Sequence, residues 1–451
     1  MNKKRFSILM TAAFMATVFA ACGGGAKSGS GDNNQQTPET PSQQTEAPKQ
    51  EEKPKNTGPR EITMYTAGGS IDETAFNDMY GDAIRKKFPD VKVNFIRNTT
   101  GSKIGDIIAS NTTVDIIFDS IGYQNTLRDY DIQIDLTPYI KQSNLDLSKF
   151  EPTAIEFQQK IGNGKLYALP VWTASAGLFY NKDLFDKFGV PYPKDNMTWD
   201  EVYDLAVRLT RNEGGVQYVG YVTSVSHQAN TNQLGLKYVN PETGKAQIDN
   251  DAWTNYMKSI TRFFEIPGME WTAQNATTAA MRNMFDVERI AAMYTNYSGG
   301  TPPADMNWDV VNVPHYPEAP GVGPQSYPAY LSITTLSKNP DLAFEVVQFL
   351  VSEEYQLENT RKGRATVLNN PSIIKEYGQG MDKFKGKNVA SMFPTKRAPI
   401  GDYSPEDSLV ATQFNAAFTD IVVNKTDVNT ALRKANEEAN KKIEERKAMG
   451  Q

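Results

Sequence analysis

Apolar and polar residues follow two spacings along the chain, one typical of strands and one typical of helices. Apolar runs at 61–66, 91–96 and 114–118 predict strands, and the last of these suits a buried parallel strand. Between the first two runs, apolar residues at helical spacing from Phe76 to Phe88 predict a helix that Pro89 ends. Because strands alternate with helices, the pattern predicts an α/β sheet.

The same alternation continues along the rest of the chain. Further strands are predicted at 164–171 and 177–180, and Thr198-Trp-Asp-Glu201 forms a capping box that opens a helix. Apolar spacing predicts another helix at 340–350. The segment 428–449 spaces its apolar residues three or four apart, which indicates a helix docked on the body, with a coiled-coil seam as the alternative.

The N-terminus has the features of an export signal. Cations at 3–5 precede a charge-free apolar run at 6–21, which is too short to span a bilayer comfortably, so residues 1–21 are predicted to be a signal peptide. Phe19-Ala-Ala-Cys22-Gly23 resembles the bacterial lipoprotein cleavage box, with Phe19 where Leu is usual. That resemblance implies that Cys22, the chain's single cysteine, carries a lipid such as palmitate. The alternative is an ordinary signal followed by a free thiol.

Composition separates a tether from a folded body. Residues 22–59 are rich in Gly, Ser, Gln, Pro and Glu, which predicts a disordered tether. The remaining chain is too long for one hydrophobic core, so two domains are expected. The formal charge is −6, and it becomes −9 once the three signal cations are removed. An acidic body without a basic patch is a poor nucleic-acid binder.

One long stretch carries a resemblance to a known family. Residues 163–185, followed by Gly189-Val-Pro and the capping box, resemble the central signature of family 1 extracellular solute-binding proteins. Two more landmarks agree, at 285–300 and 332–350. The resemblance implies a periplasmic-binding-protein-like type II fold, in which two α/β lobes are joined by a three-segment hinge. The landmarks place the N-lobe at 60–172 and 328–363, the C-lobe at 173–327 and 364–451, and the crossovers near 172–176, 323–331 and 360–366.

The resemblance also implies a function and a location. We expect an extracytoplasmic monomer, anchored to the cell membrane by lipidated Cys22, that captures a sugar, in particular an oligosaccharide, between its lobes. Hinge closure would then present the loaded form to the permease subunits of an ABC importer. Ferric iron and polyamines are the alternative ligands, but iron sites of related proteins use clustered tyrosines, and no two tyrosines are adjacent here. Polyamine sites need several carboxylates around aromatic rings.

Position along the chain selects the candidate binding residues. Trp172 follows Pro170 at the first crossover, where the family has a cleft wall, although a core position is its alternative. Asp119 ends a buried parallel strand, where ligands of open α/β sheets collect, although a helix N-cap by Asp119 or Ser120 is equally compatible. A sugar site needs aromatic platforms and polar groups together. The other candidates are Gly68, Ser70, Tyr123, Trp271, Asn296, Tyr297, Tyr327 and Tyr330.

Catalytic and metal chemistry find little support in the sequence. His227 and His315 lack His or Cys companions, which argues against zinc, and the motifs of serine hydrolases, P-loop enzymes and dinucleotide enzymes are absent. A glycoside hydrolase, which needs only two carboxylates, is the remaining enzymatic alternative. Asp249-Asn-Asp251 and 402–407 are rich in oxygen but read first as turns rather than calcium sites. No cofactor and no catalytic residue are expected.

Overall fold

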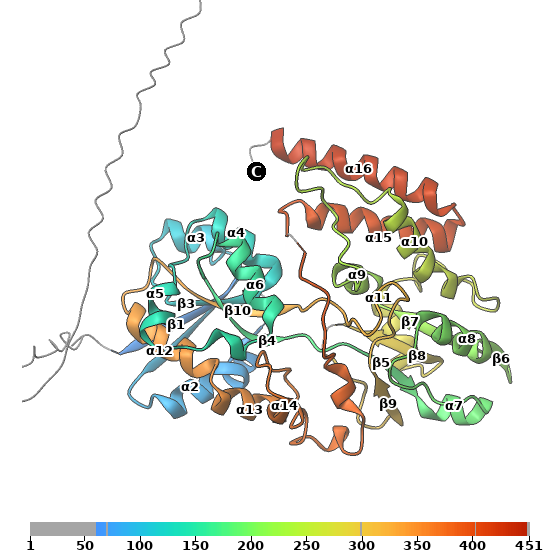
Figure 1. The fold of residues 1–451 in the computed structure, drawn as a ribbon, viewed down its shortest axis with the longest axis horizontal. Helices are drawn as coiled ribbons and strands as arrows, with labels where there is room; N and C mark the ends of the chain where they lie inside the picture. Colours follow the sequence, from blue (N-terminus) through green and yellow to red (C-terminus); the bar gives the residue numbers. More distant parts are fainter. Residues whose placement is uncertain (1–59, 69–70, 298–299, 402, 449–451) are drawn as a thin grey trace, which may run out of the picture. The chain divides into compact units, whose positions relative to one another are not determined.

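The computed structural model describes residues 60–68, 71–297, 300–401 and 403–448, and its strands form two separate five-stranded sheets (Figure 1). The first sheet has the order β2-β1-β3-β10-β4, and the second has the order β6-β7-β8-β5-β9. Both sheets are packed against helices. The two α/β units predicted from the sequence are therefore confirmed, whereas the predicted residue boundaries of the lobes stay predictions.

The first sheet combines early strands with one strand from far later in the chain. β1 runs parallel to β2 and β3, whereas β10 lies antiparallel between β3 and β4. Because β1 and β3 are parallel, the loops that follow them leave the same edge of the sheet. The strands are β1 (Glu61–Thr66), β2 (Lys92–Arg97), β3 (Ile116–Ser120), β4 (Leu169–Thr173) and β10 (Pro328–Ile333).

The second sheet is also mixed. β7 and β8 are parallel, whereas β5 is antiparallel to both β8 and β9, and β6 pairs with β7 as a short hairpin. The ends of β7 and β8 therefore lie together, as the ends of β1 and β3 do in the first sheet. The strands are β5 (Gly177–Asn181), β6 (Arg211–Glu213), β7 (Val216–Thr223), β8 (Ala291–Asn296) and β9 (Trp308–Val311).

Side chains along β1 point alternately to the two faces of the first sheet, and both faces are covered by apolar clusters. Ile62 and Met64 pack in one apolar cluster together with α2 and α12, whereas Tyr65 packs in another with α3 and α4. The helices in this part of the chain are α1 (Glu73–Phe76), α2 (Asp82–Lys87), α3 (Ile104–Ala109), α4 (Gln124–Asp129), α5 (Thr137–Gln142), α6 (Pro152–Ile161), α12 (Pro340–Leu350), α13 (Glu353–Arg361) and α14 (Pro371–Ile374).

A larger apolar cluster surrounds the second sheet. The predicted final helix, α16, docks through Leu432, Ala439 and Ile443 and contacts α10 and α15, so the docked interpretation is confirmed (Figure 1). The capping box at Thr198 and Glu201 is also present. The helices here are α7 (Lys182–Phe188), α8 (Trp199–Leu209), α9 (Val225–Asn230), α10 (Asp251–Thr261), α11 (Thr278–Asp286), α15 (Asp407–Asn424) and α16 (Val428–Ala448).

Two predicted elements differ from the structure. The strand predicted at 164–171 begins only at Leu169. The backbone of Leu166 is bonded elsewhere, because its carbonyl accepts the Leu136 N–H and its N–H donates to the Thr137 hydroxyl at the start of α5. The single helix predicted from Phe76 to Phe88 is interrupted by a π-helical turn at Asn77–Gly81. Phe76, Tyr80 and Ile84 are buried four residues apart, a spacing that an uninterrupted α-helix also gives, so the apolar pattern does not reveal the π-helical turn.

The three predicted crossovers meet and are hydrogen-bonded to one another. The Thr173 hydroxyl lies 2.9 Å from the Ser326 hydroxyl, and the Thr173 N–H donates to the Ala365 carbonyl at 3.2 Å. The Ala174 N–H donates to the Tyr327 carbonyl at 3.2 Å. Thr173, in the first of these segments, thus binds both of the others, so the three segments form a single junction.

Candidate functional site

The loops after β1 and β3 are joined by a buried carboxylate. Asp119, at the carboxyl end of β3, accepts the N–H of Ala67 at 2.5 Å and the N–H of Gly68 at 3.1 Å. Desolvation raises the pKa of Asp119 to about 6, although these two N–H groups act in the opposite direction. Ser120 occupies the N-cap position of the following 3₁₀ turn at Ile121–Tyr123, but its side chain makes no capping hydrogen bond.

The Tyr123 ring lies beside this carboxylate, and the Tyr327 hydroxyl lies near Gly122 in the following turn. A Cβ built on Gly68 would meet the Asp119 carboxylate at 3.1 Å and the Tyr123 ring at 3.4 Å. A Cβ on Gly122 would lie 3.4 Å from the Tyr327 hydroxyl. Burial, followed by the charges of Asp119 and Tyr327, raises the pKa of Tyr123, whose side chain is still 36% exposed. The predicted residues Gly68, Asp119, Tyr123 and Tyr327 therefore form one cluster, called here the strand-end cluster.

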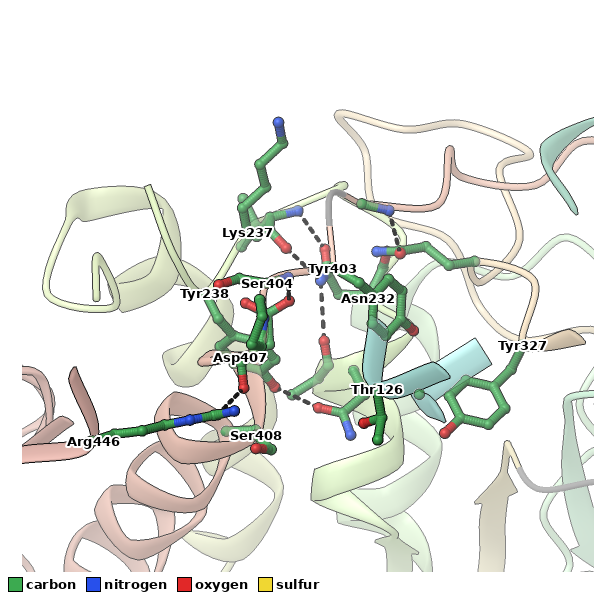
Figure 2. Close-up of a pocket in the computed structure, with 18 of the residues that line it drawn as sticks. Thr126, Asn232, Lys237, Tyr238, Tyr327, Tyr403, Ser404, Asp407, Ser408 and Arg446 are labelled. Atoms are coloured by element: carbon green, nitrogen blue, oxygen red, sulfur yellow. Dashed lines mark hydrogen bonds between the residues drawn. The ribbon is translucent and has the colours of Figure 1, made fainter. Parts of the chain in front are cut away.

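A pocket with a volume of about 380 Å³ adjoins the strand-end cluster through Gly122 and Tyr327 (Figure 2). It is bordered by α4 from the first sheet's side and by α9, α15 and α16 from the second sheet's side. Its side-chain groups include Thr126, Asp129, Asn230, Asn232, Lys237, Tyr238, Gln325, Tyr327, Tyr403, Ser404, Asp407, Ser408 and Arg446.

The polar groups of the pocket are held by hydrogen bonds. The Tyr238 hydroxyl donates to Asn230 Oδ1 at 2.9 Å, and Arg446 Nη1 donates to the Pro405 carbonyl at 2.7 Å (Figure 2). The Ser404 N–H donates to Asp407 Oδ2 at 2.9 Å. Desolvation raises the pKa of Asp407 to about 7. Aromatic rings beside hydroxyl, amide and carboxyl groups can bind both the apolar faces and the hydroxyls of a polyhydroxylated ligand.

Trp172 and Tyr330 lie on neighbouring strands but differ in exposure. Trp172 is half-buried at the end of β4, and its Nε1–H donates to the Tyr80 hydroxyl at 3.0 Å. It packs partly against the first sheet's core and does not line the described pocket, so its predicted ligand contact stays a prediction. Tyr330 is fully buried in β10, and its hydroxyl donates to the Ala154 carbonyl at 2.9 Å. The structure therefore places Tyr330 inside the first sheet and apart from the pocket lining.

The candidates of the second sheet are buried. Tyr297 is 4% exposed within the large apolar cluster, and the Asn296 side-chain amide donates to the Gly300 carbonyl at the end of β8. Trp271 is 5% exposed, and its ring packs at 63° against Phe264. None of these three lines the described pocket. Their predicted ligand contacts stay predictions, and so does that of Ser70, which lies outside the described residues together with Cys22.

Most residues of the pocket were missed by sequence reasoning. Asn232 and Tyr238 come from the loop after α9, Tyr403 from the segment before α15, and Arg446 from α16. These segments are far apart in the chain and share no motif. The one available signal was the oxygen-rich run at 402–407, which the sequence suggests is a turn. In the described part of the run, Asp407 does accept the Ser404 N–H at the start of α15.

Within the described ranges, no group of three or more His, Cys, Asp or Glu side chains is arranged to hold a metal ion. Among the helices of this same part of the chain, none combines the length and the apolar character needed to cross a bilayer.

Sequence comparison gives one family match and several relatives. The sequence model of the bacterial extracellular solute-binding protein family matches residues 67–357. A probable ABC transporter-binding protein of Deinococcus radiodurans is 26% identical over 277 residues, which are 56% of this chain and 63% of that protein. The chain thus spans less than two thirds of the length of the curated relatives it matches.

Solved structures share the fold. A sugar transporter from Rhizobium etli, in an open conformation, has a TM-score of 0.68 at 19% identity and covers 84% of this chain and 99% of its own. A substrate-binding protein of Listeria monocytogenes, in complex with cycloalternan, has a TM-score of 0.66 at 18% identity and covers 85% and 98%. These likenesses confirm the predicted two-lobe type II fold.

Proposed function

The chain belongs to the bacterial extracellular solute-binding protein family, and from this premise we propose that it captures a carbohydrate, specifically an oligosaccharide. The observation that carries the proposal is the pocket, in which Tyr238, Tyr327 and Tyr403 stand among hydroxyl, amide and carboxyl groups. Sugars offer apolar C–H faces and many hydroxyls, so rings and polar groups together are the complement they need. The naming of the Rhizobium etli relative as a sugar transporter also supports this ligand class.

Binding is proposed to act through closure of the two lobes. The pocket takes residues from helices beside both sheets, and the three crossovers are bonded to one another at Thr173. A ligand that contacts both sides stabilises the closed state over the open one, because it makes all its contacts only when the lobes approach. The closed form would be the one that the permease subunits of an ABC importer recognise.

The location and the partners belong to the same proposal. An extracytoplasmic monomer held by lipid on Cys22 would stay close to the permease it serves, and the tether at 22–59 would let the body reach it. Metabolic labelling with a palmitate analogue tests the anchor. Label in the wild type and its absence in Cys22→Ser support lipidation, whereas equal labelling of both contradicts it.

A thermal-shift screen across sugar classes, followed by calorimetry on the hits, tests the ligand. A ligand that binds only the native form stabilises it by mass action and therefore raises Tm. At a hundredfold excess over Kd, the free energy of unfolding rises by about 2.7 kcal/mol. Oligosaccharides should raise Tm and be recovered intact after incubation. A shift by a cation, polyamine or peptide in place of any carbohydrate would refute the sugar assignment, and cleavage of the oligosaccharide would refute the transport function.

A further inference from the structure

Three glutamines form a buried cluster beneath α4, the helix that contributes Thr126 and Asp129 to the pocket. Gln124 begins α4, Gln133 follows it in the chain, and Gln158 lies in α6. Their exposed fractions are 1%, 6% and 0%. Polar side chains this deeply buried are expected to have partners for every hydrogen-bonding atom, because each unsatisfied atom costs free energy.

The cluster has one junction and three atoms without partners. Gln124 Oε1 accepts from Gln158 Nε2 at 3.0 Å and from Gln133 Nε2 at 3.4 Å, and Gln133 Nε2 also donates to the Ser332 hydroxyl at 2.7 Å. Gln124 Nε2, Gln133 Oε1 and Gln158 Oε1 have no hydrogen-bond partner within the described chain. One donor group and two acceptors are therefore left around the same junction.

Rotating the amides does not remove these unsatisfied atoms. Turning one amide alone would bring two oxygens or two nitrogens together at the junction, where donor and acceptor now meet. Turning all three would restore the junction but leave two donor groups and one acceptor without partners. Every consistent arrangement thus leaves three polar atoms that only a further molecule can satisfy.

We infer that Gln124, Gln133 and Gln158 bind one internal water molecule, and that this water positions α4 under the pocket. A single water would accept from Gln124 Nε2 and donate to Gln133 Oε1 and Gln158 Oε1, the three atoms without partners, and about three bonds are typical of a buried water. A cation would be opposed by the Gln124 amide N–H groups, and an anion would be opposed by the two carbonyl oxygens. Neutral water is the species that satisfies both.

The bonding partners explain the positioning role. Ser332 lies in β10 and Gln158 in α6, whereas Gln124 directly follows Tyr123 of the strand-end cluster. The water would therefore reinforce the direct bonds that join the start of α4 to α6 through Gln158 and to Ser332 of β10 through Gln133. This inference does not depend on which solute the protein carries, so its failure would leave the proposed function untouched.

A crystal structure of the ligand-free protein at about 2 Å or better, where ordered waters are visible, tests the water directly. The expected result is a density peak at hydrogen-bond distance from all three unpartnered atoms. Absence of density there, with the glutamines rearranged to satisfy one another, would overturn the inference.

Magnetic relaxation dispersion of water provides an independent count of long-lived internal waters. Gln158→Met should lower this count by one. The matched control is Gln356→Met, because Gln356 is an equally buried glutamine whose amide already bonds Val171, Leu350, Thr366 and Val367. The control should leave the count unchanged, and an unchanged count in Gln158→Met would contradict the water site.

Amide hydrogen exchange tests the positioning role. Gln158→Met loses both the water and the direct Gln158 Nε2–Gln124 Oε1 hydrogen bond, so exchange in α4 should speed up by about tenfold, because local opening of that helix becomes easier. Exchange in α4 should be unaffected in Gln356→Met, whose side chain lies in α13. Loss of the water without faster exchange in α4 would show that the water fills the cavity but does not position the helix.

Discussion

The two sheets of this protein end in similar loops but use their aromatic residues differently. After β3 of the first sheet, Tyr123 is 36% exposed beside a buried carboxylate. After β8 of the second sheet, Tyr297 is 4% exposed inside the largest apolar cluster. An aromatic residue that follows a buried strand is thus an ambiguous signal, and the packing around it decides whether the ring meets solvent or the core.

The largest effect is expected from a buried aromatic residue of the second sheet's side. Trp271→Ala should lower the free energy of unfolding by about 3–5 kcal/mol, because the ring packed against Phe264 leaves a cavity. Urea denaturation measures it, with Trp271→Phe as the milder control. A loss below about 1 kcal/mol together with lost sugar binding would instead make Trp271 a ligand contact.

Asp119 should give the first sheet's side a distinct pH dependence. Its pKa is about 6 in the folded protein and near 3.9 when unfolded, so the folded state holds this proton more tightly. The contribution of this group to the free energy of unfolding is fully present below the unfolded pKa and is lost as pH rises through the folded pKa. The total loss is about 3 kcal/mol. Urea denaturation from pH 4 to 7 should show this fall in the wild type relative to Asp119→Asn. Parallel curves would contradict it.

Tyr123 is expected to affect binding rather than stability. Tyr123→Ala should weaken binding of the oligosaccharide found by the screen about tenfold to a hundredfold, or about 1.4–2.8 kcal/mol. The reason is that the ligand loses a stacking surface, the exposed ring of the strand-end cluster that adjoins the pocket. Calorimetry gives the affinity, and Tyr123→Phe is the control that keeps the ring. A marked fall in Tm with unchanged affinity would contradict this prediction, because Tyr123 would then act in stability, as is expected of Trp271.

Tyr130 should show the smallest effect. It follows α4 directly and is 48% exposed, but it belongs neither to the strand-end cluster nor to the lining of the described pocket. Tyr130→Ser should therefore change stability by less than about 0.5 kcal/mol and leave the affinity unchanged. A binding loss as large as that of Tyr123→Ala would extend the site along α4.

Local patterns in the sequence were sufficient to predict much of the fold. The β1 strand, the capping box at Thr198 and the helix at 340–350 each depend on neighbouring residues, and all three are present. The strand-end cluster was predicted in part because parallel strands bring their carboxyl ends together.

The pocket could not be predicted in the same way. Asn232, Tyr403 and Arg446 come together only through the packing of α9, α15 and α16, and no local spacing encodes that arrangement. Likewise, burial of Tyr297 and Tyr330 depends on contacts with distant segments. The π-helical turn at Asn77–Gly81 was missed because the buried residues Phe76, Tyr80 and Ile84 keep the four-residue spacing that also predicts an α-helix.

The position of β10 has a consequence for how the chain folds. β10 separates β3 from β4, yet it is made roughly 200 residues after β3, so closing this long loop must precede completion of the first sheet. A chain that ends before residue 328 would leave both neighbouring strands with unpaired edges. Contacts between such distant segments slow folding. The first sheet is therefore completed late, after most of the chain has been made.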